Sequence, residues 1–446
     1  MPYIQNTENE QREMLRAIGV ESIKDLFEPL PASTRLGRDL DIPVGMDEAS
    51  LRRHMIELAK KNRPLGDGPS FLGAGRTRHY VPVIVDHLAG RSEFVTAYTP
   101  YQPEASQGSL QVFFEFQTMI AQITGMEIAN SSVYDGASAL AEAALMALSL
   151  QKVDRIVVSK ASHPEDRDTL RTYLRNLDVE LVEVPLKEGR TDLDATRKAL
   201  EVGASALCFQ SPNFLGILED GAALTEIAHE AKALSIVSVH PLSLGVVAPP
   251  GDYDADIVVG DGQPLGCPPY LGGPAFGIFA TREKFIRRLP GRIVGQTVDG
   301  QGRQGYVLTF QTREQHIRRD KATSNICTNN ALMALRGAIY LAAMGERGFA
   351  AVAESCLVQA HAAARAITQV EGCSLLYDGQ PFFCELAVQL PKKAKEVNRH
   401  LAKKGIQGGY DLGRFDPALD HAMLLAVTEV TSGDDVDRLV AALREL

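Results

Sequence analysis

Several common features are missing from this sequence of 446 residues, and each absence excludes a class of protein. No run of about 18 or more apolar residues occurs, so a membrane-spanning helix is not expected. Basic residues are outnumbered, because 46 lysines and arginines face 56 aspartates and glutamates, and a nucleic-acid partner is therefore not expected. The cysteines lack CxxC spacing, so we predict no metal site and expect reduced thiols in a cytoplasmic protein at Cys208, Cys267, Cys327, Cys356, Cys373 and Cys384.

Lysine is also absent from one long stretch, between Lys232 and Lys284. Longer stretches without lysine occur elsewhere, for example from Lys61 to Lys152. The gap therefore means little by itself, and its meaning depends on the fold.

Residues 1–65 are expected to form a helical arm. Thr7 supplies an N-cap and Glu10 an acidic first turn, which is the usual chemistry of a helix start. Further helices are predicted over residues 21–27 and 46–61. In an oligomeric enzyme such an arm more often contacts a partner than performs chemistry.

The pattern changes over residues 66–330 to alternating strands and helices. Short apolar segments predict strands over 155–159, 181–184, 206–209, 235–239 and 257–259. Helices are predicted over 113–124, 136–150, 192–202 and 222–234. This alternation is typical of a parallel sheet with helices on both faces.

Residues 331–446 are predicted to form a small α+β domain. Its expected elements are helices over 329–345, 350–370 and 394–404, strands over 383–388 and 422–430, and a closing helix after Thr431. A large α/β domain with a mainly parallel sheet and a small C-terminal α+β domain resembles the aspartate-aminotransferase-like transferases that depend on pyridoxal phosphate (PLP), known as fold type I. Layout alone does not set function.

The positions that anchor PLP in such enzymes carry unusual residues here. They hold PLP as a Schiff base on a lysine after a late strand, where this chain offers Gln263, which cannot form one. His240 stands where an acid usually faces the pyridine nitrogen. Asp135, before the glycine that opens the predicted helix at 136, would repel a phosphate, although an ordinary N-cap explains it equally well. We expect that this chain does not hold PLP covalently.

A polar, aromatic loop is the first candidate for a binding site. Pro100 and Pro103 restrict its backbone and hold the neighbouring side chains in a fixed presentation, which suits recognition, although a structural loop would look the same. We predict that four of its residues reach the active site: Tyr98, Thr99, Tyr101 and Gln102.

The second candidate lies within residues 313–329. Its basic residues are equally compatible with a solvated helix face. Its hydroxyl and amide groups are suited to donate hydrogen bonds to a phosphate or carboxylate, and we predict a contribution to a partner's cofactor site from Thr323, Ser324 and Asn325.

Several long motifs resemble the glycine cleavage system P-protein, glycine decarboxylase. The likeness is to its N-terminal half, which some bacteria carry as a separate subunit 1. The motifs occur in the right order from about residue 71 to 330, and include Phe71-Leu-Gly-Ala-Gly75, Tyr98-Thr-Pro-Tyr-Gln102, Gln210-Ser-Pro-Asn-Phe214, Arg313-Glu-Gln-His-Ile-Arg318 and Lys321-Ala-Thr-Ser-Asn-Ile-Cys327.

This resemblance implies a place for the missing lysine. In that family the PLP lysine belongs to the second half or subunit 2, and the first half contributes to a shared site. The resemblance implies a complex that binds glycine, releases CO₂ and transfers the aminomethyl group to the lipoyl arm of H-protein. The sequence leaves the stoichiometry open between a heterodimer and a dimer of heterodimers.

Two alternatives stay open. A self-sufficient PLP-dependent aminotransferase or lyase would need another lysine, and the nearby candidates, Lys284 and Lys321, do not follow a predicted strand convincingly. A non-catalytic scaffold subunit would tolerate substitutions in the loop from Tyr98 to Gln102 without a change in turnover.

Overall fold

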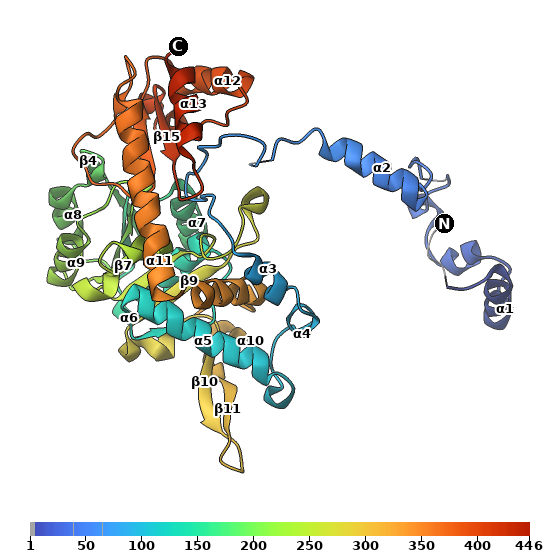
Figure 1. Ribbon diagram of the computed structural model, residues 1–446. Helices are drawn as coiled ribbons and strands as arrows, with labels where there is room; N and C mark the ends of the chain where they lie inside the picture. The colour runs from blue at the N-terminus through green and yellow to red at the C-terminus, as the bar shows by residue number, and fades with distance from the viewer. Residues whose placement is uncertain (1–4, 39, 65) are drawn as a thin grey trace. The chain divides into compact units, whose positions relative to one another are not determined.

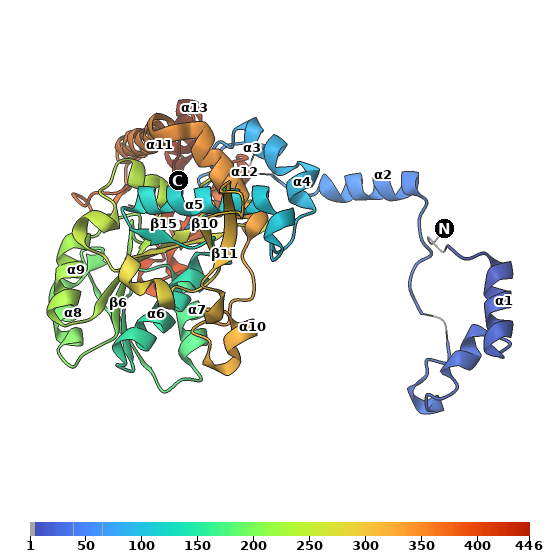
Figure 2. The same ribbon diagram turned by 90° about the horizontal axis from the view of Figure 1, so that it is seen from below.

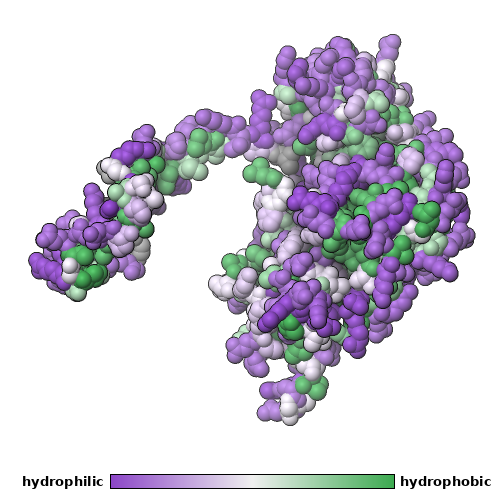
Figure 3. All heavy atoms as spheres, turned by 180° about the vertical axis from the view of Figure 1, so that it is seen from behind, coloured by the Kyte–Doolittle hydropathy of each residue, from purple (hydrophilic) through white to green (hydrophobic). Residues whose placement is uncertain are grey.

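The computed structural model describes residues 5–38, 40–64 and 66–446, and the chain divides into two compact units after Asp67. The first unit contains α1 (Glu8–Ile18), η1 (Ile23–Phe27), η2 (Ala32–Thr34) and α2 (Glu48–Ala59). A capping box between Thr7 and Glu10 starts α1, as predicted. None of the unit's described residues is buried, and Val44 is 93 % exposed. Figure 3 shows hydrophobic residues among hydrophilic ones on the surface of the protein.

A seven-stranded sheet organises the second unit. The strand order is β1-β9-β8-β7-β6-β2-β3, and the five strands from β8 to β3 run parallel, which confirms the predicted fold class. The antiparallel strands β9 and β1 complete one edge and were not predicted. The bounds are β1 (Ile128–Ala129), β2 (Arg155–Ser159), β3 (Glu180–Val184), β6 (Ala206–Ser211), β7 (Leu234–Val239), β8 (Ile257–Asp261) and β9 (Gly277–Thr281).

Helices cover both faces of this sheet (Figures 1 and 2). On one face the core joins Val157 and Phe209 to α5 (Gln107–Thr124), α8 (Leu193–Leu200) and α9 (Gly221–Glu230). On the other face it joins Ile156 and Cys208 to α6 (Gly136–Gln151) and α7 (Pro164–Leu174). Successive side chains of a strand point to opposite faces of the sheet. The central strands have apolar residues at successive positions, so both of their faces are apolar.

Helix α5 begins at Gln107, six residues before the predicted start at Phe113. The Gln107 side chain bonds in both directions with the backbone of Tyr306, at 2.9 Å each. Tyr306 belongs to a hairpin of β10 (Ile293–Val298) and β11 (Gln304–Thr309), which projects from the unit in Figure 1 and was not predicted. This contact between distant parts of the chain holds the polar first turn of α5 in place.

The long helix α11 (Ala331–Ile367) links the large sheet to a smaller antiparallel one with the order β12-β13-β15-β14. Two helices were predicted here, and α11 has its kink where they were separated, at Gly345, whose φ of 59° suits glycine. The smaller sheet and its helices are β12 (Ser374–Leu375), β13 (Glu385–Gln389), β14 (Tyr410–Asp411), β15 (Ala422–Ala426), α12 (Ala394–Lys403) and α13 (Gly433–Leu443).

Short elements connect these layers. They are α3 (Val83–Ala89), α4 (Ser92–Val95), α10 (Gln315–Arg318), β4 (Leu186–Lys187) and β5 (Arg190–Thr191), with several turns of 3₁₀ helix. The three-domain division with boundaries near residues 65 and 330 stays a prediction.

The sequence predicted neither a membrane-spanning helix nor a disulfide bond. Among the described residues, no helix is both long enough and apolar enough to cross a membrane. The six cysteines form no disulfide, and all except Cys327 are buried.

Candidate functional site

A cavity of about 360 Å³ lies at the carboxyl ends of β7 and β8. Ligands of open α/β sheets bind at this edge, because the strands end there and loops surround the opening. The lining comes from the loop before α3, the start of α6, the ends of β7 and β8, and the start of β13. This is where a fold-type-I enzyme with the predicted layout would hold its cofactor.

Gln263 lies two residues after β8, beside this cavity, and its side chain is fully engaged within the chain. Its amide nitrogen donates to the carbonyl oxygens of Thr77 and Cys267, at 3.0 and 2.7 Å. Its amide oxygen accepts from the Thr77 N–H at 3.2 Å. The residue in the predicted lysine position therefore bridges two loops, and 1 % of its surface is exposed.

Two carboxylates occupy the start of α6, where a phosphate would be cradled. Asp135 accepts from the Ser138 N–H at 2.8 Å, as an N-cap. Asp261 accepts from the Gly136 N–H at 3.3 Å and pairs with Arg76 at 3.1 Å. The sequence indicated Asp135, whereas Asp261, which lies 125 residues after Gly136, was missed. The positive end of this helix is therefore already neutralised.

His240 follows β7 and faces the same cavity. Burial, reinforced by neighbouring His79, lowers the pKa of His240 to about 3, so its imidazole is neutral near pH 7. Its Nε2 lies 3.2 Å from Thr77 Oγ1, while its buried Nδ1 has no hydrogen-bond partner in the structure. A neutral imidazole cannot replace the carboxylate that stabilises a protonated pyridine nitrogen.

Further acids make the cavity unsuitable for a phosphate. Burial raises the pKa of Asp166 to about 6, and the Asp261 and Asp135 carboxylates add to this effect. Burial also raises the pKa of Glu385, which accepts from the Ala74 N–H at 2.6 Å. Since like charges repel in a poorly solvated space, these residues together with Gln263 do not fit PLP.

The predicted loop from Tyr98 to Gln102 lies apart from this lining, between α4 and a 3₁₀ turn at Pro103–Ala105. Tyr98 is 81 % exposed and Tyr101 is 52 % exposed. The Tyr101 N–H donates to the Thr99 carbonyl at 2.9 Å, which holds a tight turn. The loop therefore presents its two aromatic rings outward from a fixed backbone.

Arg292 joins this loop to the second predicted segment. Its guanidinium lies 5.6 Å from the centre of the Tyr101 ring. It also donates to Thr328 Oγ1 at 3.1 Å, to Asn329 Oδ1 at 3.1 Å and to the Cys327 carbonyl at 2.9 Å. Arg292 is 4 % exposed. Sequence reasoning assigned it no role, although it ends a Pro-Gly-Arg motif, which was the available signal.

The three predicted residues of the second segment are placed differently. Thr323 and Ser324 line a small cavity of about 20 Å³ together with Arg292 and Arg313. Burial lowers the pKa of Arg313 to about 10. Asn325 is exposed. The roles of these residues, and of the four in the loop, stay predictions.

This segment borders the start of α6. The Cys327 N–H donates to the Tyr134 hydroxyl at 3.2 Å, and the Asn330 side chain donates to the Tyr134 carbonyl at 2.7 Å. The cavity at the start of α6 and the segment 313–329 are therefore neighbours, with Tyr134 between them.

Comparison with known proteins identifies the family. The family model for the glycine cleavage system P-protein matches residues 1–443. The chain belongs to this family. It is 51 % identical over 444 residues to the probable glycine dehydrogenase (decarboxylating) subunit 1 of Moorella thermoacetica, covering 100 % of this chain and 99 % of the relative. Its counterpart in Bacillus subtilis is 49 % identical over 441 residues, with 99 and 98 % covered.

A solved P-protein structure agrees with this assignment to the P-protein family. The crystal structure of glycine decarboxylase in inhibitor-bound form superposes with a TM-score of 0.90 at 47 % identity, and covers all of both chains. A sphingosine-1-phosphate lyase from Burkholderia pseudomallei, at 16 % identity, has a TM-score of 0.67 over 93 % of this chain and 94 % of its own, and supports the fold alone.

The alternative lysines do not provide a self-contained site in this chain. Lys284 follows β9, and its ammonium lies 3.6 Å from Asp256, which precedes the first residue of β8. Lys284 therefore lies near the amino end of β8, whereas Gln263 follows its carboxyl end. Lys321 lies in an exposed turn after α10.

Proposed function

We propose that this chain is the lysine-free subunit of a two-subunit glycine dehydrogenase (decarboxylating), and that the second subunit holds PLP covalently. The observation that carries the proposal is the state of Gln263, which uses its whole amide to bridge Thr77 and Cys267. The carboxylates at the start of α6 support it, because they occupy the phosphate position.

The chemistry of the complex follows from the family. PLP, when bound by the second subunit, supplies the electron sink that lets glycine lose its carboxylate as CO₂. The remaining aminomethyl group passes to the lipoyl arm of H-protein.

The outward-facing region of this chain is its proposed contribution to the shared site. Tyr98, Thr99, Tyr101 and Gln102 line the space for glycine and the lipoyl arm, on a loop that Arg292 positions. Thr323, Ser324 and Asn325 donate hydrogen bonds toward the cofactor phosphate on the partner. The proximity of both segments through Arg292 supports a single shared surface.

The N-terminal unit supports the presence of a partner subunit. None of its described residues is buried, although it carries large apolar side chains such as Ile18, Phe27 and Ile42. Covering them on another chain would remove apolar surface from water. Thiols without disulfides support a location in the cytoplasm.

The proposal is tested by an absorption spectrum of the purified chain with added PLP, alone and mixed with the lysine-bearing subunit, beside glycine-dependent CO₂ release. We expect an imine band and activity only in the mixture. An imine band from this chain alone would contradict the proposal.

A Gln263→Lys variant sharpens this test. We expect no imine band from the variant alone, because Asp135 and Asp261 still occupy the phosphate position. An imine band in the variant would show that a lysine is all that this cavity lacks.

A further inference from the structure

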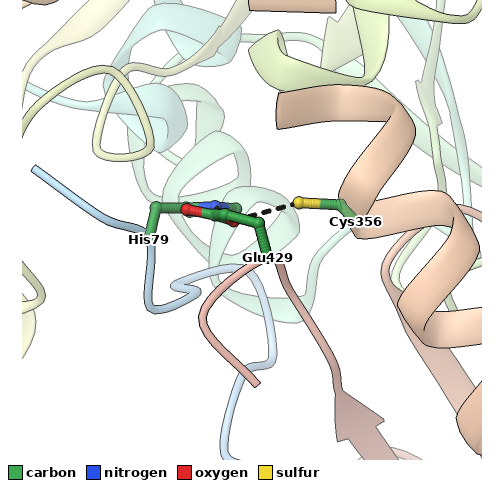
Figure 4. Close-up of side chains that lie close together, drawn as sticks. All are labelled: His79, Cys356 and Glu429. Carbon is green, nitrogen blue, oxygen red and sulfur yellow. Dashed lines mark hydrogen bonds and ion pairs between the residues drawn. The ribbon is translucent and has the colours of Figure 1, made fainter. Parts of the chain in front are cut away.

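One cluster of polar side chains is not used by the proposed function. His79, Cys356 and Glu429 come from the loop before α3, from α11 and from the loop between β15 and α13, and Figure 4 shows their side chains converging. Each offers one ligand atom, and these atoms lie within 4.8 Å of one another. Glu429 Oε2 lies 2.8 Å from His79 Nδ1 and 3.1 Å from Cys356 Sγ.

The donor set and its charge suit a divalent cation. Imidazole nitrogen, thiolate sulfur and carboxylate oxygen are the ligands that zinc and similar ions take in proteins. A thiolate and a carboxylate carry two negative charges, so a divalent ion would leave the site neutral. That balance matters because the cluster is buried: Cys356 is 0 % exposed, and the side chains of His79 and Glu429 are 2 and 11 % exposed.

A second layer of hydrogen bonds orients the ligands. His79 Nε2 lies 2.8 Å from Thr77 Oγ1, which fixes the ring and leaves Nδ1 directed at the cluster. The Tyr80 N–H donates to Glu429 Oε1 at 2.7 Å and holds the carboxylate oxygen that does not face Cys356. Such outer contacts are typical of metal ligands.

Tyr340 provides an independent observation. Its side chain is fully buried and its hydroxyl has no hydrogen-bond partner in the structure. Burial raises the pKa of Tyr340, and the Glu429 and Cys356 side chains add to this effect. A buried hydroxyl without a partner is the kind of group that a bound water satisfies.

We propose that His79, Cys356 and Glu429 bind a divalent transition-metal ion of the zinc class, with water as the fourth ligand. On binding, the S–H bond of Cys356 breaks and its proton leaves to solvent. The His79 ring loses its proton at Nδ1, where it faces Glu429, and carries it on Nε2, where it faces Thr77 Oγ1, so that sulfur–metal and nitrogen–metal bonds can form. The Glu429 oxygen must retreat by a few tenths of an ångström, because ligand atoms around a tetrahedral zinc lie roughly 3.3–3.7 Å apart. The ion connects three segments that lie far apart in the chain. Thr77, which contacts His79, also bonds to Gln263, so the ion stabilises the loop that Gln263 holds.

The test is a cobalt titration of the full-length chain after removal of metals with a chelator. We expect one equivalent of Co²⁺ to bind, a thiolate-to-cobalt charge-transfer band to appear, and Zn²⁺ to displace it. Cys356→Ser should abolish the band, and Glu429→Gln should weaken cobalt binding at least about tenfold. Cys373→Ser is the matched control, because Cys373 is a buried cysteine in a different apolar cluster and the band should persist there.

The contrary outcomes are equally clear. A wild-type chain without a charge-transfer band at a severalfold excess of Co²⁺ would overturn the proposal, as would a full band in Cys356→Ser. If both variants fail to fold, X-ray absorption of the zinc-loaded wild-type chain decides, since one sulfur among the ligands is expected and none would refute the site.

Discussion

The cavity beside Gln263 and the surface around Arg292 use polar side chains in opposite ways. In the cavity they bond to the chain itself, as Gln263 does with Thr77 and as Asp135 does with Ser138. Around Arg292, a buried guanidinium supports a loop whose Tyr98 and Tyr101 rings face outward. A cofactor position can therefore become part of the structural interior, while a neighbouring surface leaves polar and aromatic groups exposed.

The largest expected effect comes from Arg292→Ala, which removes the support of the outward-facing region. Carbonyl and amide oxygens of Cys327 and Asn329 lose a charged donor, so we expect the free energy of unfolding to fall by about 3 kcal/mol. Glycine decarboxylation by the assembled complex should fall more than about tenfold. Urea unfolding and CO₂ release measure the two effects.

Arg303→Ala is the control for Arg292, because Arg303 is an exposed arginine paired with Asp299 in the hairpin turn. It should change the free energy of unfolding by less than about 1 kcal/mol. Normal turnover in a folded Arg292→Ala complex would contradict a positioning role for Arg292.

Gln263→Ala tests the structural role of the polar side chains in the cavity. The Thr77 N–H and carbonyl and the Cys267 carbonyl lose their partners, so the free energy of unfolding should fall by about 2 kcal/mol. Turnover per folded complex should stay unchanged, because the side chain serves structure. Exposed Gln301 provides the alanine control. Lost turnover without lost stability would show that the cavity still takes part in catalysis.

Glu142 is a buried carboxyl of α6, whose pKa burial raises more than the Ser324 side chain lowers it. Burial raises its pKa from 4.5 to about 7, so between these values the folded state holds a proton that the unfolded state releases. Stability from this group is therefore full below pH 4.5 and lost as the pH rises to 7. Glu142→Gln should raise the free energy of unfolding by about 2 kcal/mol at pH 8 and leave it nearly unchanged at pH 4.5.

Denaturation at several pH values measures this effect, with Glu226→Gln, an exposed glutamate of α9, as the control. If wild type and Glu142→Gln lose stability equally between pH 5 and 8, Glu142 is not the buried acid responsible.

Tyr101→Phe is expected to have the smallest effect and addresses the loop directly. Removing the hydroxyl, which lies 3.5 Å from Arg292, should lower turnover of the complex about fivefold, or about 1 kcal/mol, and leave assembly intact. Tyr377→Phe, in the small sheet's surroundings, is the control. Wild-type turnover in Tyr101→Phe would remove this loop from the shared site and favour a scaffold role.

Prediction from the sequence succeeded where local pattern and burial agree. The strand at 155–159 was predicted to the residue, because an apolar run between polar ends is typical of a buried parallel strand. Strand β9 was missed, although it is equally apolar, because it returns antiparallel after a proline-marked loop and is followed in the chain by a 3₁₀ turn, Glu283–Arg288, instead of an α-helix. The hairpin of β10 and β11 was missed because its strands are only partly buried and show little apolar alternation.

The candidate site shows the same limit. The sequence indicated Gln263, His240 and Asp135, since each occupies a position that the layout assigns to a cofactor contact. It did not indicate Asp261 as a second carboxylate at α6, or Arg292 as the link between the two predicted segments. Those roles depend on which loops meet.

The family, the alternation of strands and helices, and the lack of a lysine after β8 follow from the sequence, because motifs and apolar periodicity are local properties of the chain. The carboxylates that line the cavity, the contact of Arg292 with Tyr101, and the meeting of His79 with Cys356 and Glu429 depend on the folded chain. Hydrogen bonds and charge pairs act over a few ångströms, so packing sets the partners of residues that lie far apart in the sequence.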